Sequence, residues 1–345
     1  MSYSYASASP LRNESLYLMY RRFFPIPAPS QKLTPVSTAQ EMHDYIAQRM
    51  GALATQGKIG IMLSGGMDSV MLAKFLPEGS IAYTLDYGEG QEQHSEFAEA
   101  AKAIPPGVTH KKLSVTREAY AEMARELTLL KREPLVPHDP AFGIGARVAR
   151  EDGITHMVYG GGADPRFAGF AHFYKDPSYE GVRKAIIKQF VAPWHVLKSP
   201  APVDWVLGHF TVGNRVDVRG FLNIVGTEGQ AVSDTLRACG LTPVAPLAEM
   251  VWTHEFDIAG RGGKYPLRDL FKLIYPGKSP NKKAPLPVPY GAWMKGYVPA
   301  RPEFRTDRLH WFGGKNLYQI YALELYMDLR DAHGWETPPG DRLMA

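Results

Sequence analysis

The chain has 345 residues, of which 45% are hydrophobic and 21% charged, and this ordinary globular composition excludes intrinsic disorder and collagen-like order. Its net charge of +4 is dispersed along the chain, so a basic nucleic-acid-binding stripe is not expected. The single cysteine, Cys239, excludes a disulfide framework and a zinc site with several thiolates. Without a run of about 18 apolar residues or a secretory signal, we expect a cytoplasmic protein that does not span a membrane.

In chain order, residues 1–36 are expected to form an irregular arm that includes a proline-rich stretch. Apolar residues at helical spacing then predict a series of helices, at 38–56, 67–76, 91–103, 116–131 and 140–152. Short apolar runs that end in turn residues predict the strands between them, at 58–66, 80–88, 108–115 and 154–164. This alternation of strands and helices predicts a parallel sheet in an α/β fold.

The second half of the chain is expected to be mainly helical and to close over one edge of the sheet. Helices are predicted at 179–190, 229–239, 247–259, 264–275 and 315–333. The predicted divisions are therefore an arm (1–36), an α/β nucleotide-binding core (37–165) and a helical region (166–345).

The strongest motif, Ser64-Gly65-Gly66-Met67-Asp68-Ser69, lies between a predicted strand and a predicted helix. Its two glycines allow the backbone to approach a ligand closely, and the two serine hydroxyls with the N–H groups of the helix start suit a phosphate. Asp68 would repel a bare anion, so it is a candidate ligand for Mg²⁺ bridging phosphates. The alternative is an ordinary Gly-Gly turn capped by serines.

At these residues the sequence resembles the PP-loop ATP pyrophosphatases, which include the asparagine, GMP and NAD synthetases and the tRNA thiolation enzymes. The resemblance implies a five-stranded-type parallel sheet flanked by helices. It also implies cleavage of ATP between the α and β phosphates. The adenine is then expected across the strand ends near Leu63 and Leu85.

A second segment, Tyr159 to Phe170, is similar to the SGEGADELFGGY motif of asparagine synthetases. This resemblance places Gly160 and Gly161 at the nucleotide and Asp164 at the second Mg²⁺ ligand. The alternative for the glycines is a flexible turn.

Residues 245–293 resemble a third family segment, also found in β-lactam synthetases. The resemblance places Lys264 on the lysine that contacts the phosphates and the developing charge; a solvated lysine at a helix start is the alternative. Lys283 is a candidate pyrophosphate contact, although a solvated charge pair with Lys282 explains it equally well.

Two departures from the family concern the incoming amine. Amide-forming members have a glutamate where this chain has Gly161, and they have a serine at the position of Tyr159, whose ring could fill part of the vacated space. His138 and Asp139 are the alternative candidates for a base. A helix cap is the other interpretation of Asp139, and the one that the sequence favours. Asparagine synthetases also begin with a glutaminase domain that uses an N-terminal cysteine, whereas this sequence begins Met1-Ser2.

The resemblance therefore implies an AMP-forming ligase that uses ATP and Mg²⁺ to adenylate a small-molecule carboxylate and transfers the acyl group to ammonia or an amine. Asp68, Asp164 and Lys264 are the expected catalytic residues. The ammonia would be free or would come from a separate glutaminase, and a homo-oligomer is compatible with the sequence. The alternatives are an enzyme that modifies a nucleobase or RNA and a nucleotide-binding homologue without synthetase activity.

Overall fold

The computed structural model describes residues 12–21, 23, 33–88, 96–225, 228–280 and 287–335. Its centre is a five-stranded sheet with the strand order β4-β3-β2-β5-β8, in which all pairs of neighbours are parallel. The strands are β2 (Ile59–Met62), β3 (Ile81–Asp86), β4 (Thr109–Ser114), β5 (His156–Val158) and β8 (Thr242–Val244). The parallel α/β sheet predicted from the sequence is therefore confirmed.

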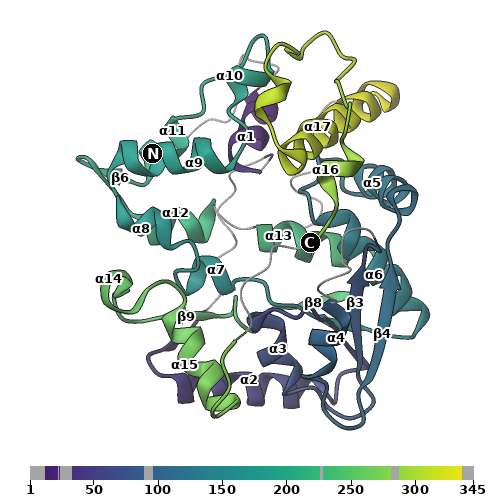
Figure 1. Ribbon diagram of the computed structural model, residues 1–345, viewed down its shortest axis with the longest axis vertical. Coiled ribbons are helices and arrows are strands. Elements are labelled where there is room, and N and C mark those ends of the chain that lie inside the picture. Colours follow the sequence, from purple (N-terminus) through teal and green to yellow (C-terminus); the bar gives the residue numbers. More distant parts are fainter. Residues whose placement is uncertain are drawn as a thin grey trace.

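Helices cover both faces of this sheet (Figure 1). One face packs against α2 (Ala39–Leu53), α3 (Met67–Ala73) and α15 (Tyr265–Ile274) in a core that includes Ile46, Ile61 and Leu270. The other face packs against α5 (Arg117–Lys131), α6 (Asp139–Glu151) and α13 (Glu228–Ala238), around Met62 and Tyr83. The helix α4 (Glu96–Ala101) lies beside β3.

The remaining elements form a helical part that extends away from α2 and α15 (Figure 1). Its longer helices are α1 (Arg12–Tyr20), α9 (Tyr179–Gln189) and α17 (Gly314–His333). Its short helices are α7 (Ala163–Arg166), α8 (Ala171–Lys175), α10 (Pro193–Val196), α11 (Trp205–His209), α12 (Val218–Ile224), α14 (Ile258–Arg261), α16 (Tyr290–Trp293) and the 3-10 helix η1 (Leu309–Trp311). Two small sheets complete the fold: parallel β1 (Thr34–Val36) with β9 (Met250–Trp252), and antiparallel β6 (Thr211–Val212) with β7 (Arg215–Val216).

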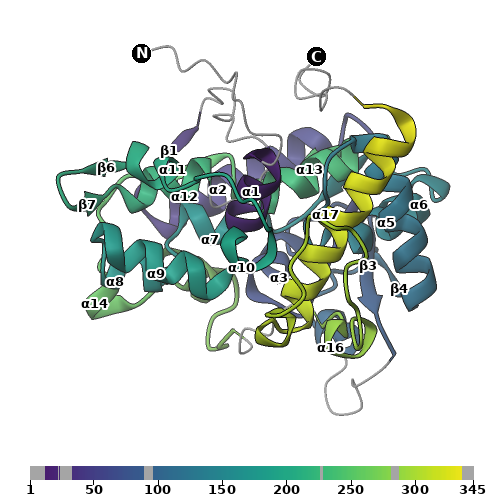
Figure 2. The same cartoon turned by 90° about the horizontal axis from the view of Figure 1, so that it is seen from above.

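The helix α1 lies within the segment 1–36 that the sequence predicted to be irregular. Three consecutive residues, Tyr17, Leu18 and Met19, are fully buried, so the helix has no polar face and its sequence shows no helical periodicity. It packs beside α17 (Figure 2), where the amide of Gln319 donates 2.9 Å hydrogen bonds to the carbonyl oxygens of Tyr17 and Leu18. Burial from all sides therefore stabilises α1.

The predicted helix at 247–259 is wrong. Met250–Trp252 instead forms β9, which pairs with β1 and buries Met250 and Trp252 while Val251 is only partly buried. An alternation of three residues is too short to distinguish a strand from a helix in the sequence.

The edge strand β8 is not predicted from the sequence, because Thr242–Val244 contains a proline and proline is unusual in strands.

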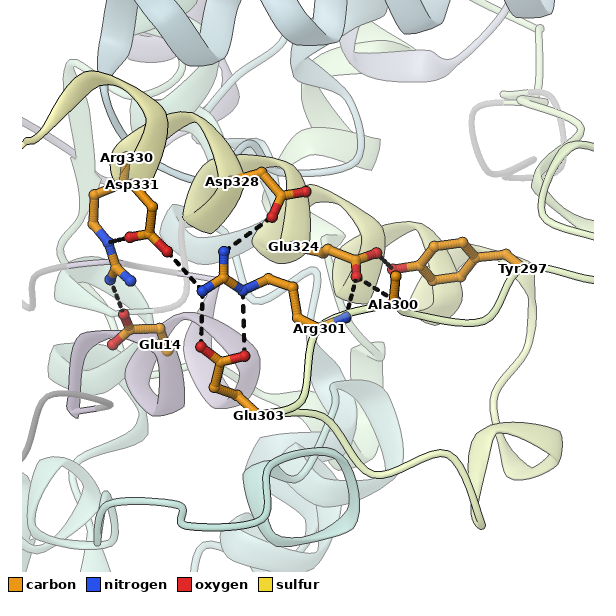
Figure 3. A network of polar contacts seen from close by, with 9 residues as sticks. All are labelled: Glu14, Tyr297, Ala300, Arg301, Glu303, Glu324, Asp328, Arg330 and Asp331. Carbon is orange, nitrogen blue, oxygen red and sulfur yellow. Dashed lines mark hydrogen bonds and ion pairs between the residues drawn. The ribbon is translucent and has the colours of Figure 1, made fainter.

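An ion-pair network ties α17 to the segment before it (Figure 3). The guanidinium of Arg301 donates hydrogen bonds to Glu303 at 2.8 Å, to Asp328 at 2.9 Å and to Asp331 at 2.7 Å. The Arg301 side chain is 16% exposed, so these contacts are less screened than ordinary surface pairs. Arg330 extends the network to the buried carboxylate of Glu14 on α1.

Replacing Arg301 by methionine should destabilise the protein by about 1–2 kcal/mol, because three partly exposed carboxylates would then face one another without a cation. Urea unfolding measures this loss. Arg305→Met is the matched control, since Arg305 pairs with the exposed Asp307, and it should cause a clearly smaller loss. Equal losses in the two variants would contradict a special contribution of the network.

Candidate active site

Two loops meet at the carboxyl edge of the sheet. One follows β2 and contains residues 63–66, and the other follows β5 and contains residues 159–162. Because β2 and β5 are neighbours while β3 lies on the other side of β2, this edge is a topological switch point, where ligands of open α/β sheets bind. The loops approach closely: a Cβ added to Gly160 would lie 3.1 Å from the Cβ of Asp68.

Asp68, Asp164 and Lys264, which we call the charge cluster, meet above these loops. The ammonium of Lys264 lies 2.6 Å from Oδ2 of Asp68 and 3.0 Å from Oδ1 of Asp164. Burial acts to lower the pKa of Lys264, but the two carboxylates outweigh it and hold that pKa above its usual value. The lysine is therefore a fixed cation, only 11% exposed, between two carboxylates.

Close backbone packing brings Lys264 to this place from a distant part of the chain. Its backbone N–H donates a 3.1 Å hydrogen bond to the carbonyl oxygen of Phe167. A Cβ at Gly263 would lie 2.7 Å from the carbonyl oxygen of Ala168, so only glycine permits this approach. Lys264 itself has a positive φ of 56° directly before α15.

The loop after β2 is stabilised by its own serines. Oγ of Ser69 accepts a 3.1 Å hydrogen bond from the Ser64 N–H and lies 3.1 Å from Oγ of Ser64. The N–H of Gly66, the N-cap residue directly before α3, donates to Oγ of Ser64 at 3.2 Å. Gly65 faces α4, because a Cβ added to Gly65 would lie 2.9 Å from the Cβ of Glu99. These internal hydrogen bonds make the loop compact, with its hydroxyls at the carboxyl edge.

The predicted adenine contacts lie beside this loop, and their side chains are largely covered. Leu63 follows β2 and is 2% exposed, and Leu85 on β3 is 6% exposed. Lys283 lies outside the described residues.

The loop after β5 is confined by its neighbours. Gly162 has a φ of 84°, and a Cβ there would overlap the backbone of Ala248. A Cβ at Gly161 would overlap the Tyr159 ring, with two ring carbons at 3.0 Å. The ring therefore takes the space of a side chain at 161. The Tyr159 hydroxyl lies 2.5 Å from Oγ of Ser233 on α13. No sequence signal identifies Ser233, because nothing predicts which face of α13 lies toward Tyr159.

The two candidate bases have different surroundings. The buried carboxylate of Asp139 accepts hydrogen bonds from Lys131 at 3.0 Å and from the Val136 N–H at 3.1 Å, so its place in the structure is explained without catalysis. His138 is partly buried, and Nε2 lies 3.5 Å from the ammonium of Lys315. Burial lowers the pKa of His138 well below its usual range, and the positive charges of Lys315 and Arg21 lower it further.

The charge cluster also bears on metal binding. Among the described residues, no group of three or more His, Cys, Asp or Glu side chains is placed to hold a metal ion. Magnesium, however, is commonly held by one or two carboxylates, with phosphate and water oxygens completing its octahedron. Asp68 and Asp164, which already share one cation, fit a magnesium ion that arrives with a nucleotide.

Residues 41–211 match a family model described as asparagine synthase. This segment is an asparagine synthase domain. It contains Asp68 and Asp164, whereas Lys264 lies beyond it. A curated relative from Methanocaldococcus jannaschii, described as "Putative asparagine synthetase (glutamine-hydrolyzing) 1", is 26% identical over 173 residues. That match covers 47% of this chain and 30% of the relative.

Two solved structures also resemble this chain, at low similarity. An NMN synthetase from Francisella tularensis is 16% identical, with 69% of this chain and 87% of that chain covered and a TM-score of 0.24. An NAD+ synthetase from Burkholderia pseudomallei is 15% identical, with 89% of this chain and 92% of that chain covered and a TM-score of 0.23.

In the part of the chain that the structure describes, no helix is both long and apolar enough to cross a bilayer.

Proposed function

We propose that the protein is an ATP-dependent ligase that activates a small-molecule carboxylate as its adenylate, releases pyrophosphate and forms an amide with ammonia or an amine. The observation that carries this proposal is the charge cluster. It places one buried cation and two carboxylates where the loops after β2 and β5 meet, and the asparagine synthase domain supplies both carboxylates.

In this proposal the loop of residues 64–69 binds the phosphates of ATP. Its serine hydroxyls exchange their mutual hydrogen bonds for phosphate oxygens, and its glycines allow those oxygens to reach the backbone. Asp68 and Asp164 would hold Mg²⁺, which supplies neutralisation of phosphate charge when it is bound. Gly160 and Gly161 form the opposite wall, where a side chain would narrow the site.

Lys264 would stabilise the charge that develops on the phosphates as the carboxylate oxygen attacks the α-phosphorus. Such a cation is effective because it is already oriented and largely shielded from water. The acyl adenylate then reacts with the amine. Holding both reactants at one sheet edge would provide much of the rate acceleration.

The proposal is tested by measuring products from [α-³²P]ATP and, in parallel, from [γ-³²P]ATP, with the purified chain, Mg²⁺ and a panel of carboxylic acids, each with ammonia or an amine. We expect AMP and pyrophosphate in equal amounts, only with an accepted acid, and an amide of that acid by mass spectrometry. EDTA should stop the reaction. Formation of ADP and phosphate, or AMP release that ignores the acid, would contradict the proposal.

A further inference from the structure

The Tyr159 ring is held rigidly on the side away from the charge cluster. Its side chain is 4% exposed and lies in the core between the sheet and α6. The ring of Phe142 on α6 contacts it edge-on, with the ring centroids 6.1 Å apart, and Ser233 holds its hydroxyl. Phe142 on α6 and Ser233 on α13 therefore limit movement of the ring away from the loop.

The glycine loop, residues 160–162, also lies close to other parts of the chain. A Cβ on Gly160 would approach Asp68, and one on Gly162 would overlap Ala248, while Gly161 faces the ring. The three glycines are thus enclosed by α3, by the segment before β9 and by Tyr159. A shift of the loop away from any one contact presses it against another. Asp164 follows this loop directly, in the first turn of α7.

We propose that Tyr159 is a positioning residue, which supports the glycine loop and thereby holds Asp164 in the charge cluster. Position 161 must be glycine because the Tyr159 ring occupies the space that a side chain there would need. The proposal rests on the proposed function for its ligand, since Asp164 is taken to act on magnesium-bound ATP. Tyr159 contacts Phe142, Ser233 and the space at Gly161, so the proposal has Tyr159 and Ser233 act through the loop.

The ring and the hydroxyl of Tyr159 have separable effects. The ring provides the surface against which Gly161 lies, whereas the bond to Ser233 fixes the ring relative to α13. Removing the hydroxyl leaves the ring between Phe142 and the loop. Removing the ring leaves a space into which the loop can relax, and a misplacement of about 1 Å at a reacting group costs up to about 100-fold in rate.

The test is a double-mutant cycle of Tyr159→Ala and Gly161→Ala, with Tyr159→Phe and Ser233→Ala as conservative variants. Isothermal calorimetry measures binding of ATP with Mg²⁺ and, separately, of ATP in EDTA. We expect Tyr159→Ala to weaken binding of magnesium-bound ATP by about 10-fold and binding of metal-free ATP by less than about 3-fold, because Asp164 is displaced. Tyr159→Phe and Ser233→Ala should each change either affinity by less than about 3-fold.

The second substitution gives the sharper result. In the wild type, Gly161→Ala should weaken binding of magnesium-bound ATP by about 10- to 100-fold, because its methyl group meets the ring. In the Tyr159→Ala background, the same change should cost less than about 3-fold, because the ring is gone. Thermal unfolding of all variants should show the same sign of coupling in Tm, since the clash exists without any ligand.

The outcomes separate the two proposals. If the wild type binds no ATP, the proposed function fails, while the coupling in Tm still decides whether the ring constrains position 161. If ATP binds but Gly161→Ala is equally harmful in both backgrounds, or harmless in the wild type, the constraint is refuted. If Tyr159→Ala weakens binding of metal-free and magnesium-bound ATP equally, the positioning of Asp164 is refuted.

Discussion

Replacing Lys264 by methionine should lower kcat for pyrophosphate release by about 10²- to 10³-fold, the loss typical of removing one oriented electrostatic group from a reacting centre. Methionine keeps much of the side-chain bulk and removes the charge. The loss should fall on kcat rather than on KM for the acid, because the cation is proposed to act on charge that develops during the reaction. Steady-state kinetics with the acid identified by the product assay measures both.

The same variant should gain affinity for a metal in the absence of nucleotide. In the wild type, the ammonium occupies the space between Asp68 and Asp164, so a divalent cation must displace it. Without it, two partly buried carboxylates face each other, and Mn²⁺ relieves their repulsion. Electron paramagnetic resonance of Mn²⁺ should show binding at least about 10-fold tighter, a coupling of about 1.4 kcal/mol.

Lys198→Met is a control for the general loss of a positive charge, because Lys198 lies outside the charge cluster. It should alter neither kcat nor Mn²⁺ binding. If Lys264→Met left kcat unchanged, the lysine would have no part in the reaction. If the variant bound Mn²⁺ no better than the wild type, the two carboxylates would not form a cation site.

Replacing Asp139 by alanine should destabilise the protein by about 3 kcal/mol, because it removes a partner from the buried ammonium of Lys131. Both side chains are fully buried, and Lys131 would keep the partly exposed Glu133 at 3.1 Å as its carboxylate, with the neutral Oγ1 of Thr235 at 3.3 Å. The Val136 N–H would also lose its acceptor. Urea unfolding measures the loss. The double variant Lys131→Met with Asp139→Ala should be more stable than Asp139→Ala alone, since no unpaired charge stays buried.

Asp139 should also influence how stability depends on pH. Burial raises the pKa of Asp139 to about 6, although Lys131 acts to lower it. Between the ordinary value near 3.8 and about 6, the folded protein therefore binds a proton that the unfolded chain does not. As pH rises across this window, deprotonation of Asp139 should therefore lower the free energy of unfolding. Asp139→Asn should lack that contribution, and an identical pH dependence in both proteins would contradict it.

The sequence predicted those parts of the fold whose signals are local. Ile59 and Ile61 form a short apolar run that ends in Gly65 and Gly66, and strand, turn and helix occur there as expected. Thr38 and Glu41 form the capping box that opens α2, at the start of the helix predicted for residues 38–56. The motifs also predicted that Asp68 and Asp164 lie together, because residues at the ends of neighbouring parallel strands lie at the same edge. Lys264 follows no strand of this sheet, and only the family resemblance placed it with them.

Features that depend on distant contacts could not be predicted. The helix α1 lacks a polar face, since α17 and the neighbouring helices bury it, and a sequence window cannot reveal such neighbours. Ser233 meets Tyr159 only because α13 packs against α6 and β8. For Asp139, the prediction left catalysis and helix capping open, and the contact that explains its burial comes from Lys131 on another helix.

The position of β8 has a consequence for synthesis of the chain on the ribosome. Until residues 242–244 have emerged, β5 is an open edge of the sheet, and its unpaired backbone groups are available to other strands. Lys264 emerges later still, so the two carboxylates exist for a time without their cation. Because chains are made from the N-terminus, the matched segment 41–211 emerges before β8, and its sheet lacks this strand until residues 242–244 follow. A nascent chain stalled at residue 211 should therefore be sensitive to protease and bound by chaperones.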